Sequence, residues 1–241
     1  MKTADWFPPQ QLAALVRRLE LVPQLLRRQI EEEITELVPL PEDWLDQQRQ
    51  DVLGDQTPEA FLEARGWDER DLSLHVRRPE ALRRFAEQRF GPGLEELFLA
   101  SEGSRDKVIY SFLRVRDSAL VRELWIRLEE GETTFAEAAA NYSEGPEKAH
   151  KGLIGPIAMG LVHPPQLATA LRSLQPGELN PPITIGDWHV LVRLEQLTPS
   201  RFDGSMREIL LNEQLGDYLT QRVNQLLAGE DVAPIHYDPP T

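Results

Sequence analysis

Apolar residues recur at helical spacing through the first part of the chain. Across residues 11–37 they fall three and four positions apart, in two stretches that Pro23 divides. Shorter helices are predicted over residues 42–52 and 59–65, the second with a proline at its start and a glycine after its end. The pattern to this point is helical.

Further helices are predicted before the pattern changes. One is capped by Asp68 or Asp71, and another begins at Pro79. Gly91-Pro92-Gly93 ends that helix and precedes a last short one. Because no stretch up to residue 105 alternates like a strand, residues 1–105 are predicted to form an all-helical domain.

Strand-like alternation appears first at residues 108–115. Ser111 and Leu113 fall on one face of this strand, and Phe112 and Arg114 on the other. The alternation indicates a sheet with helices against it.

The following residues alternate between helix signals and strand signals. Helices are predicted after the caps Asp117 and Thr134 and from Pro164-Pro165. Residues 179–185 read as an edge strand because two prolines interrupt them, and residues 188–194 alternate as a half-buried strand.

The chain then predicts one long amphipathic helix after Asp203. Its apolar stripe must be buried against another part of the protein. The residues that mark the stripe are Leu211, Leu215, Leu219 and Leu226.

Composition is that of a globular protein with an acidic surface. The formal net charge of −14 argues against nucleic acid and anionic membrane surfaces as partners. Without cysteine the chain has no disulfides, thiol nucleophiles or thiolate metal sites, and no histidine spacing indicates a metal. No cofactor is expected. Pairs of arginines are expected to lie on solvated helix faces and not to form a binding site. These pairs are Arg17-Arg18, Arg27-Arg28, Arg77-Arg78 and Arg83-Arg84.

The location predicted from the sequence is the cytoplasm. Residues 1–9 lack the continuous apolar segment of a signal peptide, and no apolar run approaches the roughly 20 residues that span a bilayer. Membrane insertion is therefore not expected.

Four short stretches in residues 108–197 carry a family resemblance. In order, these are residues 135–143, Gly152-Leu153-Ile154-Gly155-Pro156, residues 173–179 and Trp188-His189-Val190. Taken in this order they resemble a parvulin-type (rotamase) peptidyl-prolyl isomerase domain. The resemblance implies a small antiparallel sheet wrapped by helices, giving an α+β protein.

Residues 57–74 resemble the N-terminal helical domain of SurA-type bacterial chaperones. The resemblance implies that the C-terminal helix returns to pack on the helical domain. The predicted organisation is a SurA-like helical domain at 1–105, a parvulin-like domain at 106–198, and a C-terminal helix and tail at 199–241.

The family resemblance also implies a set of site residues. The last-strand histidine of the family is present as His189, whereas the first-strand histidine falls on Ser111. These are the candidate catalytic residues, and a hydrogen bond between them across neighbouring strands is expected. The family's cysteine or aspartate falls on Gly145, which has no side chain. His189 is expected to matter more for stability than for the reaction.

The substrate-binding candidates lie in residues 160–172. Carried over by position, the family's pocket methionine falls on His163 and its aromatic residues fall on Leu167 and on Arg172 or Leu171. A loop histidine without a role is an equally good interpretation of His163. These replacements predict weak isomerase activity.

The predicted function is a peptidyl-prolyl isomerase and chaperone that binds extended client segments containing X–Pro bonds. One alternative is a non-catalytic peptide-binding chaperone. Another is an adaptor that docks one partner through the N-terminal helices. The sequence leaves the oligomeric state open.

Overall fold

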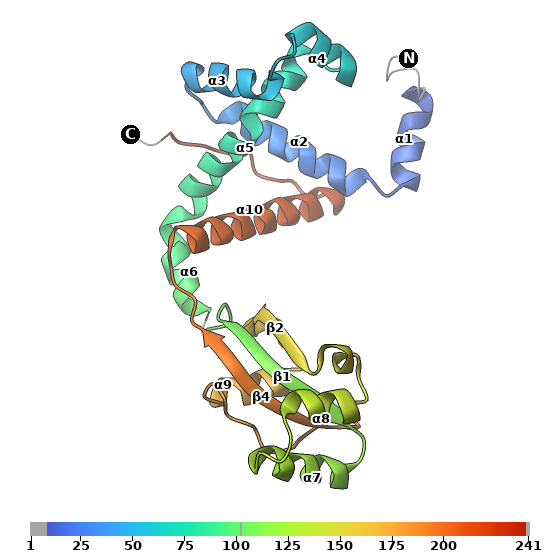
Figure 1. The fold of residues 1–241 in the computed structure, drawn as a ribbon. Coiled ribbons are helices and arrows are strands. Elements are labelled where there is room, and N and C mark those ends of the chain that lie inside the picture. The colour runs from blue at the N-terminus through green and yellow to red at the C-terminus, as the bar shows by residue number, and fades with distance from the viewer. Residues whose placement is uncertain (1–8, 102, 240–241) are drawn as a thin grey trace. The chain divides into compact units, whose positions relative to one another are not determined.

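The chain divides into two compact units in a computed structural model that describes residues 9–101 and 103–239 (Figure 1). Unit 1 combines the described residues up to Leu97 with those from Asp203 onward, and unit 2 is Phe98–Phe202. Residues 1–8, on which most of the signal-peptide argument rested, lie outside the described residues. No helix in the described ranges is both long and apolar enough to cross a membrane.

Unit 1 is helical in its described residues, as the periodicity predicted. Thr57 caps one helix by accepting a hydrogen bond from the Ala60 amide at 3.3 Å, and Gly66 ends that helix in the left-handed region. Its elements are α1 (Pro9–Arg18), α2 (Val22–Leu37), α3 (Glu42–Leu53), α4 (Pro58–Arg65), α5 (Glu69–Phe90), η2 (Gly91–Gly93) and α10 (Gly204–Leu227), and α6 (Leu94–Ala100) leads on to unit 2.

The predicted break at Pro79 is wrong, because α5 runs through it as one helix. A proline inside a helix costs about 3 kcal/mol, since it removes a hydrogen bond and crowds the preceding turn. Both halves of α5 are held by packing: Val76 lies in a cluster with Phe61, and Phe85 lies in the main core of the unit. Packing on both sides of the proline outweighs its local preference.

Helix α10 completes the core of unit 1, as the fold prediction required. Leu219 and Val223 of α10 pack in one cluster with Ile34 of α2 and Phe85 of α5. Ile235, in the irregular segment after α10, is 5% exposed and belongs to the same cluster. The helical unit is therefore built from both ends of the chain.

Unit 2 contains a four-stranded antiparallel sheet in the order β2-β1-β4-β3. Strand β2 was not predicted: Gly152-Leu153-Ile154-Gly155-Pro156 was noted as a motif of the family resemblance, and its two glycines do not indicate a strand. Strand β3 lies at an edge, as predicted, but is shorter than expected. The strands are β1 (Lys107–Val115), β2 (Leu153–Ala158), β3 (Ile183–Ile185) and β4 (Trp188–Thr198).

Two glycines allow β2 to lie close against β1. Gly152 and Gly155 both have positive φ, at 80° and 116°. A Cβ at Gly152 would lie 2.7 Å from the carbonyl oxygen of Phe112. The glycines of this motif are therefore required by strand pairing.

Helices cover both faces of the sheet, which confirms the predicted α+β fold class. Leu113 and Leu191 pack against α7 (Ser118–Glu129) and α8 (Phe135–Tyr142), with Leu124 and Phe135 in the same cluster. The opposite face packs against α9 (Pro165–Ser173) through Leu171. The sheet therefore has one face covered by two helices and one face left for α9 and a groove.

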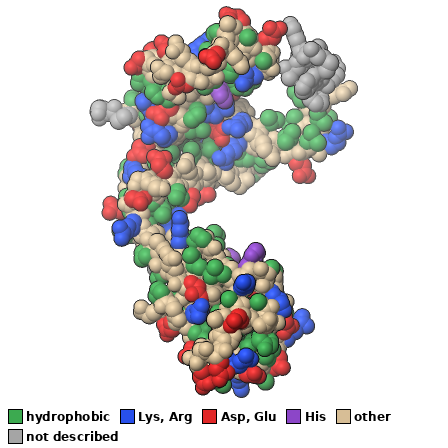
Figure 2. Space-filling view, in the orientation of Figure 1, with side chains coloured by type: hydrophobic (Ala, Val, Ile, Leu, Met, Phe, Trp, Pro, Cys, Tyr) green, Lys and Arg blue, Asp and Glu red, His purple; other side chains and the backbone are tan. Residues whose placement is uncertain are grey.

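Two of the arginine pairs of unit 1 form ion pairs with a glutamate of the same helix, whereas Arg77 and Arg78 are half-buried and do not lie on a fully solvated face. Arg27 and Arg28 both contact Glu31, and Arg83 and Arg84 both contact Glu80. Hydrogen bonds from Arg83 and then Arg84 lower the pKa of Glu80 to about 2, although burial opposes the shift. Figure 2 shows basic and acidic side chains interspersed over the visible face, as expected for solvated helix surfaces.

The contribution of α10 to unit 1 gives a first prediction. Leu219→Ala should lower the free energy of unfolding by about 2–5 kcal/mol, because this side chain is 1% exposed in the shared core. Leu226→Ala is the matched control, since Leu226 was predicted on the same stripe but is 40% exposed. Urea unfolding followed by circular dichroism measures both, and equal effects would contradict the packing described here.

Candidate functional site

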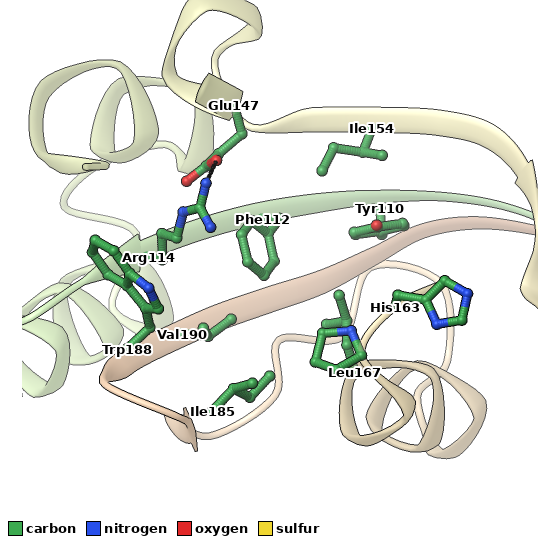
Figure 3. Close-up of a pocket in the computed structure, with 11 residues that line it drawn as sticks. Tyr110, Phe112, Arg114, Glu147, Ile154, His163, Leu167, Ile185, Trp188 and Val190 are labelled. Atoms are coloured by element: carbon green, nitrogen blue, oxygen red, sulfur yellow. Dashed lines mark ion pairs between the residues drawn. The ribbon is translucent and has the colours of Figure 1, made fainter. Parts of the chain in front are cut away.

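A groove of about 260 Å³ lies on the α9 side of the sheet in unit 2 (Figure 3). Its walls come from all four strands, from α9 and from the segments before α9 and β2. Most of the lining side chains are apolar or aromatic: Tyr110, Phe112, Ile154, Pro164, Leu167, Ile185, Trp188 and Val190. The remaining lining residues are Arg114, Glu147 and His163.

The aromatic and aliphatic wall of the groove is formed by side chains that alternate along the strands and therefore face the same side. Tyr110, Phe112 and Arg114 are every second residue of β1 and share the groove face. Val190 of β4 pairs with Arg114 in register and faces the same way. Burial raises the pKa of the Tyr110 hydroxyl. The groove is therefore suited to apolar side chains and rings.

A charged pair closes one end of the groove. The Nη2 atom of Arg114 lies 3.3 Å from Oε2 of Glu147, whose side chain is only 5% exposed. Ser143 donates a hydrogen bond to the other Glu147 oxygen. The Arg114 guanidinium also lies 5.2 Å from the ring centre of Trp188. Glu147 is therefore buried with both oxygens bonded, as a buried carboxylate must be.

Gly145 leaves room for that charged pair. A Cβ built at Gly145 would overlap the Arg114 guanidinium and the Glu147 carboxylate. The family resemblance implies a cysteine or aspartate at this position, where the chain has no side chain. The structure fills the same space with two charged side chains that reach it from other positions.

His163 and Leu167 line the groove, at the end away from Arg114 (Figure 3). His163 is exposed and Leu167 is 2% exposed. The other two substrate-binding candidates, Leu171 and Arg172, are not among the lining residues. Leu171 is fully buried in the core beneath α9, and Arg172 is exposed in the last turn of that helix. The arginine at the groove is therefore Arg114 and not Arg172.

The expected hydrogen bond between Ser111 and His189 is wrong. The antiparallel register pairs Ser111 with Arg193 and pairs His189 with Val115. Four residues along a strand is about 13 Å, far beyond hydrogen-bonding distance. Ser111 instead donates to Glu195, and Nδ1 of His189 lies 3.0 Å from the Thr184 hydroxyl.

Ser111 and His189 also fall on the face of the sheet away from the groove. Ser111 is two residues from Leu113 in β1, and His189 is two residues from Leu191 in β4, so each faces the same side as its leucine. Both leucines pack against α7 and α8. Neither lines the groove. Their catalytic role stays a prediction, and the structural role of His189 agrees with its bond to Thr184.

Several residues that line the groove were not predicted from the sequence, although a signal for some of them was present. The alternation in β1 separated Phe112 and Arg114 from Ser111, but the family alignment drew attention to Ser111. Glu147 had no local signal, because its role follows from burial beside Arg114. In the described ranges, no group of three His, Asp or Glu side chains is arranged to hold a metal ion.

A protein-family model matches part of unit 2, from the last residue of β1 to near the end of β4. Residues 115–196 match the family model described as a PPIC-type PPIase domain (rotamase). The match includes β2, β3, α9, most of β4 and the segment that carries Glu147, whereas Phe112 and Arg114 of β1 lie before its first residue. Unit 2 therefore contains a parvulin-type rotamase domain, as its motifs predicted.

Curated relatives are SurA chaperones. The chain is 26% identical to chaperone SurA of Vibrio cholerae over 145 residues, 56% of this chain and 33% of that protein. It is 28% identical to chaperone SurA of Vibrio vulnificus over 153 residues, 60% of this chain and 36% of that protein. The chain thus spans about a third of the length of these relatives.

A solved structure supports the same fold. The crystal structure of the peptidylprolyl isomerase PrsA from Bacillus cereus matches with a TM-score of 0.50 at 17% identity. The match covers 97% of this chain and 92% of that one. At this identity the similarity describes the fold, and it includes both the helical unit and the sheet.

The register of β1 and β4 gives a second prediction. Ser111→Ala and His189→Ala should lower the melting temperature of unit 2 additively, because the two side chains make separate hydrogen bonds. Ser111→Ala and Glu195→Ala should be coupled by about 0.5 kcal/mol or more, because they remove the same bond. A double-mutant cycle by thermal unfolding measures both, and coupling between Ser111 and His189 would refute the register.

Proposed function

We propose that unit 2 binds an extended client segment in its groove and catalyses cis–trans isomerisation of an X–Pro bond. The observation that carries the proposal is the groove itself, whose lining is mostly aromatic and aliphatic. A proline ring is apolar and rigid, and such a wall fits it. The similarity to SurA chaperones and the rotamase match support client polypeptides as the partners.

The chemistry requires no nucleophile. Resonance gives the peptide C–N bond a rotation barrier of about 18–20 kcal/mol. An X–Pro bond retains only about 0.5–1 kcal/mol of trans preference, so both isomers are populated in clients. A twisted amide is less dipolar than a planar one, and a groove that excludes water therefore favours the twisted state.

Catalysis is proposed to be weak compared with a parvulin that carries the full family motif. His163 is less apolar than the methionine that the family resemblance implies there. Gly145 lacks the cysteine or aspartate side chain that the resemblance implies at that position. Each 1.4 kcal/mol of lost barrier reduction is about tenfold in rate.

A non-catalytic peptide-binding chaperone is the second candidate. The observation in its favour is that neither Ser111 nor His189 lines the groove. Binding of proline peptides without acceleration of isomerisation would establish this candidate. An adaptor that uses unit 1 would bind one partner and leave the aggregation of unrelated clients unchanged.

The division at 1–105, 106–198 and 199–241 is retained as a proposal for domain boundaries. Residues 106–198, expressed alone, are expected to fold and to retain the groove. Neither the fold nor the similarities support the cytoplasmic location, which stays a prediction that cell fractionation tests.

The groove gives a third prediction. Ile154→Glu should lower the isomerisation rate of an Ala-Pro peptide by about tenfold or more, because an ionised carboxylate in the apolar wall retains water. Leu153→Glu is the matched control: Leu153 is the neighbouring residue of β2, is 54% exposed and does not line the groove. Exchange spectroscopy at known protein concentration measures both variants.

Two results would count against the proposal. Equal activity of Ile154→Glu and the wild-type protein would exclude this groove as the site. Absence of exchange with the wild-type protein, together with retained peptide binding, would favour the non-catalytic chaperone.

A further inference from the structure

The Arg114 side chain lies at the groove and is held there as a hydrogen-bond donor. It reaches from β1 into the space beside Gly145, where any side chain at position 145 would overlap it. Glu147 and the ring of Trp188 fix it from two sides. Figure 3 shows the guanidinium between Glu147 and Trp188, beside the wall formed by Phe112 and Val190. A flexible arginine is thereby held in one place.

The guanidinium has donors left for a ligand. Arginine carries five N–H donors, and the ion pair to Glu147 uses Nη2. The Nε atom is buried against Gly145 and is not accessible to a ligand, although it has no hydrogen-bond partner within the described part of the chain. The donor left for a ligand is therefore Nη1, since Nη2 contacts Glu147. Because Glu147 already balances the positive charge, the complementary acceptor is a neutral atom of a peptide and not a carboxylate.

Amide chemistry decides which neutral acceptor benefits catalysis. In the planar amide the nitrogen lone pair is delocalised toward the carbonyl oxygen. As the bond twists, the lone pair returns to the nitrogen, which becomes an acceptor, while the oxygen loses negative charge. A donor at the carbonyl oxygen would favour the planar ground state, and a donor at the nitrogen favours the twisted state.

We propose that Arg114 is a catalytic residue that donates a hydrogen bond to the prolyl nitrogen of the twisted X–Pro bond. Glu147 is its positioning residue, and Gly145 provides the space. The inference rests on the isomerase function proposed above and names the group that acts in it. No covalent bond is made or broken, and the proton remains on the guanidinium throughout.

The first test removes the donor. Arg114→Met should lower kcat for an Ala-Pro peptide by about tenfold or more while the dissociation constant changes less than about threefold. Arg116→Met is the matched control, because Arg116 lies 5.0 Å from the same Trp188 ring but is exposed and does not line the groove. Exchange spectroscopy over a range of peptide concentrations separates kcat from affinity, and thermal unfolding checks the fold.

The second test displaces the guanidinium without removing it. The backbone at Gly145 has φ −110° and ψ 178°, which alanine adopts without strain. Gly145→Ala should therefore push the guanidinium aside and lower kcat as Arg114→Met does. The double variant should be no slower than either single one, because both remove the same interaction.

The third test addresses Glu147. Glu147→Gln leaves the guanidinium charge unbalanced, so the ratio of the rates for Glu-Pro and Ala-Pro peptides should rise about tenfold in this variant. A purely structural Glu147 would lower both rates equally. An unchanged ratio would overturn the positioning role.

The outcomes separate this inference from the proposed function. Wild-type exchange that survives in both Arg114→Met and Gly145→Ala overturns the catalytic role of Arg114 and leaves the isomerase function standing. An inactive wild-type protein overturns the isomerase function, and the catalytic role of Arg114 with it.

Discussion

The pairing of β1 with β4 determines which side chains of unit 2 reach the groove. The two strands pair from Lys107 opposite Thr198 to Val115 opposite His189, with one register shift between Ile109 and Tyr110. In a strand, successive residues face opposite sides, so a shift of one residue would exchange the groove wall for the helix-facing core. Leu113 and Leu191 fix the register by their complete burial against α7 and α8. Phe112, Arg114 and Val190 then face the groove.

The groove combines apolar walls with one balanced charge pair. A buried Glu147 without a partner would be strongly destabilising, and Arg114 and Ser143 together remove that cost. The pair brings a fixed donor to an otherwise apolar surface without adding net charge. That combination suits a neutral peptide segment.

Periodicity in the sequence predicted the helical domain and the two faces of β1, because periodicity reports burial directly. The α+β fold class and the return of α10 were implied by the family resemblances. Strand β2 was missed, since Gly152 and Gly155 resemble a loop locally and only their closeness to β1 explains them. A break was predicted at Pro79 because the packing of both halves of α5 is a tertiary effect.

The site was predicted less well than the fold. Of the four predicted substrate-binding residues, His163 and Leu167 line the groove. Leu171 is buried in the core, and Arg172 is exposed to solvent. Their positions depend on the rotation of α9, which a family alignment without geometry does not fix. The Arg114–Glu147 pair joins residues from β1 and the η3 segment (Pro146–His150), and no local pattern links them.

The most direct test of the account is to locate a bound proline peptide on unit 2. Protein labelled with ¹⁵N is titrated with an Ala-Pro peptide, and amide and indole shifts are followed by NMR. The account predicts the largest changes at the Trp188 indole and at the amides of Phe112, Arg114 and Val190. Changes centred on α7 and α8, or in unit 1 with none at Trp188, would contradict it.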